Sequence, residues 1–136
     1  MNFVTGATGF IGRRLVERLE GEVKVLSRQA YPDYETVVCD LQTEEIPDDA
    51  LEGIDTVFHL AGFTHDMRDA DKIADLYYKV NVSTTVQLAN LAVKSSIKRF
   101  IFVSSVKAGG IPTLGTCANE KDQKNTEDVY GKTKRE

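Results

Sequence analysis

Two clusters near opposite ends of the sequence carry residue types from which chemistry can be inferred. The first is a glycine triplet in G-x-x-G-x-x-G spacing, Thr5-Gly6-Ala7-Thr8-Gly9-Phe10-Ile11-Gly12. Glycines let a backbone bend sharply and approach a ligand where any Cβ would collide, so this cluster suits a pyrophosphate. The second is Tyr130-Gly131-Lys132-Thr133-Lys134, whose tyrosine and lysine are four residues apart and would share one face of a helix.

The elements predicted around the glycine triplet strengthen its interpretation. Asn2–Thr5 has the pattern of a short buried strand, and a helical pattern follows in which Ile11, Leu15 and Leu19 recur every four residues. Gly21 lies where a glycine that ends a helix is expected. In a strand, turn and helix of this kind, the free N–H groups at the helix start face an anion. We therefore predict a phosphate-binding turn; the alternative is a tight turn with no ligand.

The rest of the chain alternates strand patterns with helical ones. Further strands are predicted at 22–27, 36–39, 56–60 and 99–104, and a long helix at 71–95. Strands that alternate with helices throughout form parallel sheets with right-handed crossovers. The predicted fold class is α/β, a doubly wound parallel sheet with strand order 3-2-1-4-5 and helices on both faces. Between 107 and 128 no periodicity is visible, so a mobile loop is predicted at the ligand-binding edge of the sheet.

Composition limits the class of protein. A length of 136 residues with 41% hydrophobic and 28% charged residues is ordinary for one domain with a real core. The net charge of -4 and the lack of a basic block give no reason to expect a nucleic acid or a membrane as partner. Cys39 and Cys117 lie far apart without a histidine cluster, so neither a zinc site nor a disulfide framework is indicated. With no signal-peptide pattern, a cytoplasmic location is the default expectation.

Besides the glycine loop, five motifs, including the tyrosine/lysine pair, occur in register along the chain. An acidic-apolar pair, Asp40-Leu41, follows the third predicted strand, and an H-x-A-[AG] motif, His59-Leu60-Ala61-Gly62, lies at the end of the fourth. The long helix carries an N-V pair, Asn81-Val82. Two serines, Ser104-Ser105, end the fifth strand, and the last motif is Tyr130 with Lys134. With the glycine loop, they resemble the extended branch of the short-chain dehydrogenase/reductase superfamily, the NAD-dependent epimerase/dehydratase family. The resemblance covers nearly the whole chain and implies that residues 1–136 form a Rossmann domain that binds NAD(P).

The resemblance implies a role for each matching residue of the active site. Tyr130 would be the acid or base on a substrate hydroxyl or carbonyl, and Ser105 would bond the same oxygen. Lys134 would bind the nicotinamide ribose and stabilise the phenolate. A tyrosine has a pKa of about 10, so lowering it by about three units takes roughly 4 kcal/mol. Asn81 would support this catalysis, although a bond to neighbouring backbone explains it equally well, and Ser104 is expected only to bond at the strand end.

The same resemblance implies which residues contact the dinucleotide. The glycine loop would hold the pyrophosphate, Asp40-Leu41 the adenine, and the small residues after the fourth strand would let the dinucleotide pass. The full predicted set is Gly6, Thr8, Gly9, Phe10, Ile11, Gly12, Arg28, Asp40, Leu41, Leu60, Ala61, Gly62, Tyr130 and Lys134. The alternatives are structural: an aspartate that caps a turn, and small residues at a crowded crossover. No metal is expected.

The choice of cofactor depends on the end of the second predicted strand, where an acidic residue would bind the ribose 2′-hydroxyl of NAD. This sequence has Ser27-Arg28 there. A guanidinium can pair with the 2′-phosphate of NADP, whereas a carboxylate would repel it. NADP is therefore favoured over NAD; the alternative is a solvated arginine on a surface turn.

Three departures from the family pattern bear on the substrate. Ala108-Gly109-Gly110 replaces an aromatic-glycine pair that commonly lines the substrate pocket. Val106-Lys107 stands where sugar-nucleotide dehydratases have an acidic pair, so dehydration is disfavoured. The tract at 126–129 lacks the family's proline, which leaves the start of the last helix less fixed.

Extended family members continue well beyond the tyrosine/lysine pair, whereas this sequence ends two residues after Lys134. We expect a fragment that lacks the later strands and the substrate domain. Its last helical turn should fray, so the chain should bind NAD(P) weakly and turn over nothing. For the full-length parent, a homodimer is left open.

Three functions are compatible with these residues. The favoured one is an NAD(P)-dependent epimerase or reductase, acting on a nucleotide-sugar with Tyr130 as acid/base in the full-length parent. The second is an NADPH-dependent reductase of a small carbonyl compound, which Arg28 and the atypical pocket residues suit. The third is a non-catalytic NAD(P)-binding module, in which Tyr130→Phe would leave function unchanged.

Overall fold

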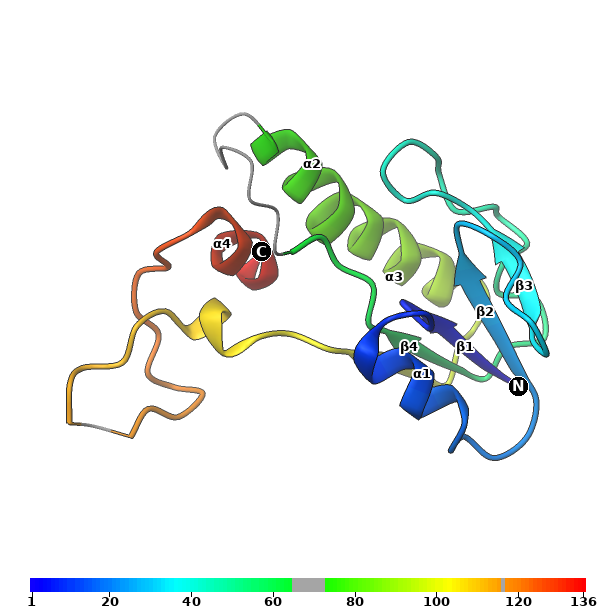
Figure 1. Cartoon of the computed structure of the whole chain (residues 1–136), viewed down its shortest axis with the longest axis horizontal. Coiled ribbons are helices and arrows are strands. Elements are labelled where there is room, and N and C mark those ends of the chain that lie inside the picture. The colour runs from blue at the N-terminus through cyan, green and yellow to red at the C-terminus, as the bar shows by residue number, and fades with distance from the viewer. Residues whose placement is uncertain (65–72, 116) are drawn as a thin grey trace.

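The computed structural model describes residues 1–64, 73–115 and 117–136. Its strands are β1 (Asn2–Thr5), β2 (Val23–Ser27), β3 (Glu35–Val38), β4 (Thr56–His59) and β5 (Arg99–Phe102). They form one sheet in the order β3-β2-β1-β4-β5, and every neighbouring pair is parallel (Figure 1). The predicted fold class and strand order are confirmed, and each strand ends within two residues of its predicted bounds.

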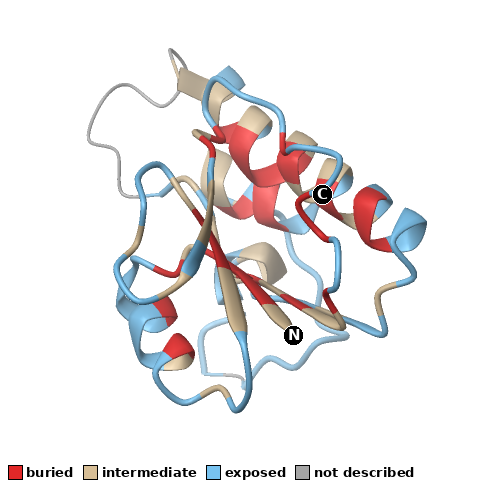
Figure 2. Ribbon diagram, turned by 90° about the vertical axis from the view of Figure 1, so that its right-hand side faces the viewer, coloured by how far each residue is buried: buried red, intermediate tan, exposed pale blue. Residues whose placement is uncertain are grey.

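Two hydrophobic clusters, one on each face of the sheet, form the core. Successive strand residues point to opposite faces, so Val4 and Val25 pack with Val16 of α1 (Phe10–Val16). The cluster on the other face combines strand residues with residues of α3 (Thr84–Lys94): Phe3, Leu26, Val57, Leu88, Leu91 and Ala92. Figure 2 shows buried residues along the central strands and along the helices that cover them.

The expectation that helices alternate with strands throughout is wrong. β2 joins β3 through residues 28–34, and β3 joins β4 through residues 39–55; both connections are fully described and neither contains an α-helix. In the first, the rings of Tyr31 and Tyr34 stack with centroids 5.4 Å apart. In the second, the loop itself enters the core through Ile46, Leu51 and Ile54. Apolar loop side chains therefore cover the sheet at these two connections in place of helices.

The predicted long helix is present, but its middle turn is π-helical. It consists of α2 (Ala74–Tyr78), the π-helix η2 (Lys79–Ser83) and α3. Residues 71 and 72, with which the prediction began, lie outside the described residues. This crossover helix connects β4 to β5 across one face of the sheet (Figure 1).

The chain beyond β5 contains a 3₁₀-helix, η3 (Val106–Gly109), and the helix α4 (Val129–Arg135). Between them, the described part of the predicted loop is irregular. The last helix was expected to fray, yet Gly131, Thr133 and Lys134 are buried. Within the described ranges, no helix is long and apolar enough to cross a membrane.

Candidate functional site

The glycine loop joins β1 to α1 in a backbone arrangement that only glycine allows at two positions. Gly6 has a φ of +73°, and a Cβ on it would lie 2.7 Å from the Ala61 nitrogen. A Cβ on Gly12 would lie 2.1 Å from the Gly6 carbonyl oxygen, far inside van der Waals contact. That oxygen also accepts a hydrogen bond from the Gly9 N–H at 3.0 Å. The glycines thus let the loop fold onto itself and onto the end of β4.

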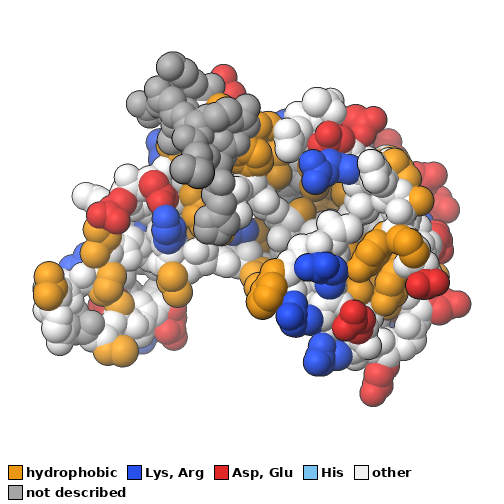
Figure 3. Space-filling model, viewed as in Figure 1, with side chains coloured by type: hydrophobic (Ala, Val, Ile, Leu, Met, Phe, Trp, Pro, Cys, Tyr) orange, Lys and Arg blue, Asp and Glu red, His pale blue; other side chains and the backbone are white. Residues whose placement is uncertain are grey.

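The outer side of the glycine loop is open to solvent. Thr8, Gly9, Phe10 and Ile11 are exposed, and among the described residues no side chain caps the start of α1. The first N–H groups of α1 are therefore not bonded by a side chain. The Arg14 guanidinium carbon lies 4.1 Å from the centre of the Phe10 ring. Figure 3 shows Lys and Arg side chains gathered on this side of the molecule, so the surface here suits an anion.

The segments that follow β2 and β3 carry the next predicted contacts. Arg28 follows β2 directly and is exposed. Leu41 is only 9% exposed and belongs to the core. The Asp40 carboxylate accepts from the Gln42 N–H at 3.0 Å, and the Asp40 N–H donates to the Glu44 carboxylate at 2.5 Å. These bonds agree with an aspartate that caps a turn; its contact with an adenine stays a prediction.

A chain of hydrogen bonds runs from β1 to the crossover helix. Thr5 Oγ1 accepts from the Ala61 N–H at 3.1 Å and lies 2.6 Å from His59 Nδ1. His59 Nε2 lies 2.9 Å from Thr85 Oγ1, which donates its proton to the Asn81 carbonyl at 2.8 Å. Because the Thr85 proton is used, Thr85 must accept from His59 Nε2–H, and His59 Nδ1 must accept from Thr5. The contacts thus assign the tautomer of the imidazole.

The environment of His59 keeps the ring neutral. It is 0% exposed, and its ring lies 5.7 Å from the Phe102 ring and 6.3 Å from the Phe100 ring, between centroids. Burial, and then repulsion by the charge of Lys134, lower the pKa of His59 to about 4. A neutral ring with both nitrogens bonded is a structural residue at the edge of the sheet.

Asn81 connects three elements from its place in η2. Its Oδ1 accepts from the Phe63 N–H at 2.7 Å, and its Nδ2 donates to the Phe63 carbonyl at 3.1 Å and to Thr133 Oγ1 at 3.0 Å. Thr133 in turn donates to the Tyr130 carbonyl at 3.1 Å. A Cβ on Gly62 would lie 3.3 Å from Asn81 Oδ1, which accounts for the small residue there. These bonds hold α4 against the crossover helix, and a part in catalysis stays a prediction.

Asp128 fixes the start of α4. Its Oδ1 accepts from the Gly131 N–H at 2.7 Å, while its Oδ2 pairs with the Lys107 ammonium of η3. The pairing lowers the pKa of Asp128 and raises that of Lys107. The expectation of a less fixed helix start is wrong because an aspartate N-cap replaces the missing proline. A Cβ on Gly131 would lie 2.7 Å from the Lys107 carbonyl oxygen, so this glycine lets η3 approach α4.

Lys134 is held against the chain that leaves β5. It is 6% exposed, its Nζ donates to the Val103 carbonyl at 2.8 Å, and the ammonium lies 4.0 Å from the centre of the Phe102 ring. Burial lowers the pKa of Lys134. Ser104 Oγ donates to the Lys134 carbonyl at 3.3 Å. Ser104 was expected to make a hydrogen bond at the end of β5, and it does so with α4.

Ser105 is half-buried, and its Oγ accepts from the Lys107 N–H at 3.3 Å. Together with Ser104 and Lys134 it lines a cavity of about 970 Å³. The other walls belong to η3, the loop after it and the two ends of α4. Of the described residues, half-buried Tyr130 and the glycine loop do not line this cavity. The cavity thus lies on the loop side of α4.

The predicted site residues fall into three groups. One lies at the glycine loop and just after β4, the second is Arg28 with Asp40 and Leu41 after β2 and β3, and the third lies around α4 with Ser105. Asn81 bonds to the third group through Thr133. The partners that hold these groups in place were not predicted from the sequence: Thr5, Thr85, Lys107, Asp128 and Thr133. Only Asp128 carried a signal, since an aspartate directly before a helical run is a common N-cap.

Comparisons with known proteins agree with this geometry. The model of the NAD dependent epimerase/dehydratase family matches residues 2–136. UDP-glucose 4-epimerase of Vibrio cholerae is 37% identical over 145 residues, which cover 98% of this chain and 43% of that protein. A 3-beta-hydroxysteroid dehydrogenase of Mycolicibacterium neoaurum is 32% identical over 114 residues, which cover 75% of this chain and 31% of that protein.

A solved structure gives the same answer for the fold. MoeE5 in complex with UDP-glucose and NAD matches with a TM-score of 0.84 and 30% identity, covering 98% of this chain and 45% of that one. The chain therefore spans less than half the length of each of these relatives.

Proposed function

The chain belongs to the NAD dependent epimerase/dehydratase family, and on that premise we propose that its parent is an NAD(P)-dependent epimerase or reductase of a nucleotide-linked sugar. The observation that carries the proposal is Lys134, docked beside the serines after β5 at the same sheet edge as an exposed glycine loop. UDP-glucose 4-epimerase and the MoeE5 complex with UDP-glucose and NAD support the substrate class.

In this proposal residues at the carboxyl edge of the sheet would hold the dinucleotide, whose chemistry when bound is hydride transfer. Gly6 and Gly12, at which any Cβ would collide with backbone, keep the loop free of side chains and so fit a pyrophosphate. The exposed loop residues Thr8 to Ile11 would contact it, together with Ala61 and Gly62, which follow β4. The residues present therefore fit the cofactor.

Three side chains around α4 would carry out or assist the proton transfer. Tyr130 would give a proton to the substrate oxygen or take one from it, and Ser105 would donate a hydrogen bond to the same oxygen. Lys134 shares a helix face with Tyr130, and its charge would stabilise the phenolate. Asn81 would keep this face in place through Thr133.

The catalytic part of the proposal is tested by Tyr130→Phe in the full-length parent. Without the phenol, turnover of a UDP-sugar should fall about 10²- to 10⁴-fold while cofactor affinity stays nearly intact. Tyr78→Phe, at a half-exposed position of α2, is the matched control and should retain full turnover. Full turnover by Tyr130→Phe would contradict the proposed chemistry and favour a non-catalytic binding module.

We further propose that NADP is preferred to NAD, because exposed Arg28 directly follows β2, where a carboxylate would select NAD. NADPH should bind at least about tenfold more tightly than NADH, and Arg28→Ala should abolish the difference. Arg18→Ala, past the end of α1 and at the other edge of the sheet, should preserve it. Tighter binding of NADH by the wild-type chain would overturn the preference.

A second candidate is a dehydrogenase or reductase of a small alcohol or carbonyl compound. It is favoured by the replacement of an aromatic-glycine pair by Ala108-Gly109-Gly110 and by the similarity to a 3-beta-hydroxysteroid dehydrogenase. Product assays of the full-length parent with a UDP-sugar and with a hydroxysteroid separate the two candidates. Turnover of the hydroxysteroid alone would replace the nucleotide-sugar proposal.

Three further expectations stay predictions. The 136-residue chain alone is expected to bind NAD(P) weakly without turnover, and measurable turnover by it would contradict this. A homodimer of the parent stays open and can be decided by its mass in solution. A cytoplasmic location can be tested by fractionation.

A further inference from the structure

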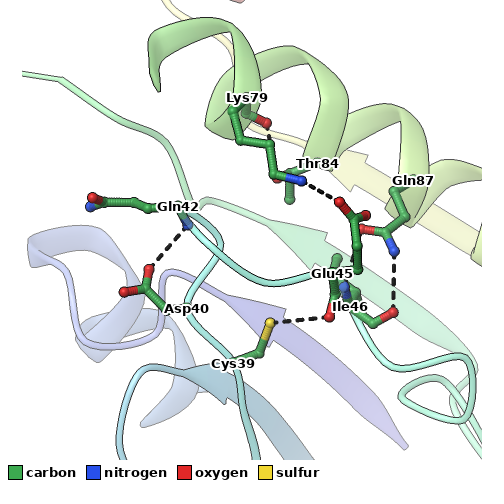
Figure 4. A network of polar contacts seen from close by, with 8 residues as sticks. All are labelled: Cys39, Asp40, Gln42, Glu45, Ile46, Lys79, Thr84 and Gln87. Atoms are coloured by element: carbon green, nitrogen blue, oxygen red, sulfur yellow. Dashed lines mark hydrogen bonds and ion pairs between the residues drawn. The ribbon is translucent and has the colours of Figure 1, made fainter. Parts of the chain in front are cut away.

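The loop that follows β3 is fastened to the crossover helix by contacts that the proposed function leaves unexplained. Gln87 Oε1 accepts from the Ile46 N–H at 3.1 Å, and Gln87 Nε2 donates to the Ile46 carbonyl at 3.2 Å (Figure 4). Eight residues earlier, the Lys79 ammonium pairs with the Glu45 carboxylate. Two side chains of one helix therefore hold two adjacent residues of the loop.

The π-helical turn explains why both side chains reach the same loop. In a regular α-helix, residues i and i+7 lie on one face because two turns take about seven residues. The wider turn of η2 takes up one residue more, so Lys79 and Gln87, which are eight residues apart, share a face. Thr84 secures this turn, since its hydroxyl donates to the Lys79 carbonyl at 3.0 Å.

The fastened loop is also bonded within itself. The Asp40 carbonyl accepts from the Glu44 N–H at 2.7 Å, and the Cys39 thiol donates to the Glu45 carbonyl at 3.6 Å. Ile46 is 3% exposed and belongs to the core. The segment from Asp40 to Ile46 therefore forms one unit whose position depends on its attachment to the helix.

We propose that Gln87 and Lys79 are positioning residues for the adenine half of the dinucleotide site. The inference rests on the proposed function and on the predicted contact of Asp40 and Leu41 with the adenine of a bound dinucleotide. Asn81, on the same π-helical turn as Lys79, holds α4. The crossover helix thus sets the position of α4 through Asn81 and the position of the segment from Asp40 to Ile46 through Gln87.

The test uses Gln87→Met, which keeps the length of the side chain and removes both hydrogen bonds to Ile46. In the 136-residue chain, the dissociation constants of the preferred dinucleotide and of ADP-ribose should both rise about tenfold. Gln87→Glu should have a smaller effect, since its carboxylate still accepts from the Ile46 N–H. Asn90→Met changes an exposed residue of the same helix and is the matched control.

Each outcome decides a different question. Weaker binding of both ligands by Gln87→Met, with faster amide exchange at 40–46 and normal binding by Asn90→Met, supports the inference. Unchanged binding by Gln87→Met, or equal weakening by Asn90→Met, overturns it and leaves the proposed function intact. A wild-type chain that binds no dinucleotide overturns the proposed function, and the inference falls with it.

Discussion

The two ends of the candidate site are held by different kinds of contact. Around the glycine loop, backbone lies directly on backbone, with Gly6 against Ala61 and Gly12 against Gly6. Around α4, polar side chains make the connections, through Asn81 to Thr133 and through Lys134 to the Val103 carbonyl. The glycine loop should therefore be destabilised when a side-chain atom is added, and the attachment of α4 should be weakened when a polar group is removed.

The largest effect is expected from an added methyl group in the glycine loop. A Cβ on Gly12 would lie 2.1 Å from the Gly6 carbonyl oxygen, so Gly12→Ala must displace backbone. We expect a loss of about 3 kcal/mol or more in the free energy of unfolding, measured with urea. Gly109→Ala is the control, since a Cβ there meets nothing within 4 Å. Equal stability of the two variants would contradict the backbone contrast.

The hydrogen bonds from β1 to the crossover helix pass through His59, so the free energy of unfolding should depend on pH. Its pKa of about 4 in the native chain lies below the usual 6.5, so the unfolded chain binds the proton first as pH falls. Stability should thus be fully present above about pH 6.5 and fall by up to about 3 kcal/mol on the way to pH 4. In His59→Gln this part of the pH dependence should be absent, which urea unfolding at several pH values will measure. The same slope in wild type and variant would rule out His59 as its source.

At the α4 end, Thr133→Val should act locally. The change keeps the shape of the side chain but leaves the Asn81 amide without one acceptor, at a cost of about 1–2 kcal/mol. Amide exchange should accelerate in α4 more than in the glycine loop. Thr43→Val, at an exposed position, should change neither. Equal acceleration at both ends would mean that α4 does not respond independently.

The smallest effect is expected at the ion pair between Lys107 and Asp128, whose side chains are 58% and 41% exposed. Asp128→Asn retains an N-cap and loses only the charge, so unfolding should cost about 0.5 kcal/mol less than in wild type, and the difference should vanish in high salt. Asp128→Ala also loses the cap, which should lower the free energy of unfolding by about 1 kcal/mol more. Equal losses for Asp128→Asn and Asp128→Ala would show that the charge contributes and the cap does not.

The order of the strands could be predicted because it follows from local patterns and from the handedness of crossovers. The connection after β3 could not. Ile46, Leu51 and Ile54 cover the sheet from a loop, and apolar residues at such intervals do not distinguish a buried loop from a helix.

For the site, local motifs predicted the glycine loop and the tyrosine/lysine pair. Their supports were not visible because they are tertiary contacts between ordinary residues. Thr5 and His59 are 54 positions apart, and Asn81 and Thr133 are 52 positions apart. No spacing rule connects such pairs, and the Asp128 cap was the one support that a local rule could have identified.

Because Lys134 is buried, its rate of reaction with an acylating reagent can report how often α4 detaches. Such reagents modify amines that are both deprotonated and reachable, and this amine is reachable only after α4 has left the Val103 carbonyl and the Phe102 ring. Exposed lysines such as Lys98 would be modified at once and provide an internal reference. The rate at which Lys134 is labelled therefore counts how often the last helix detaches, without any need for a substrate.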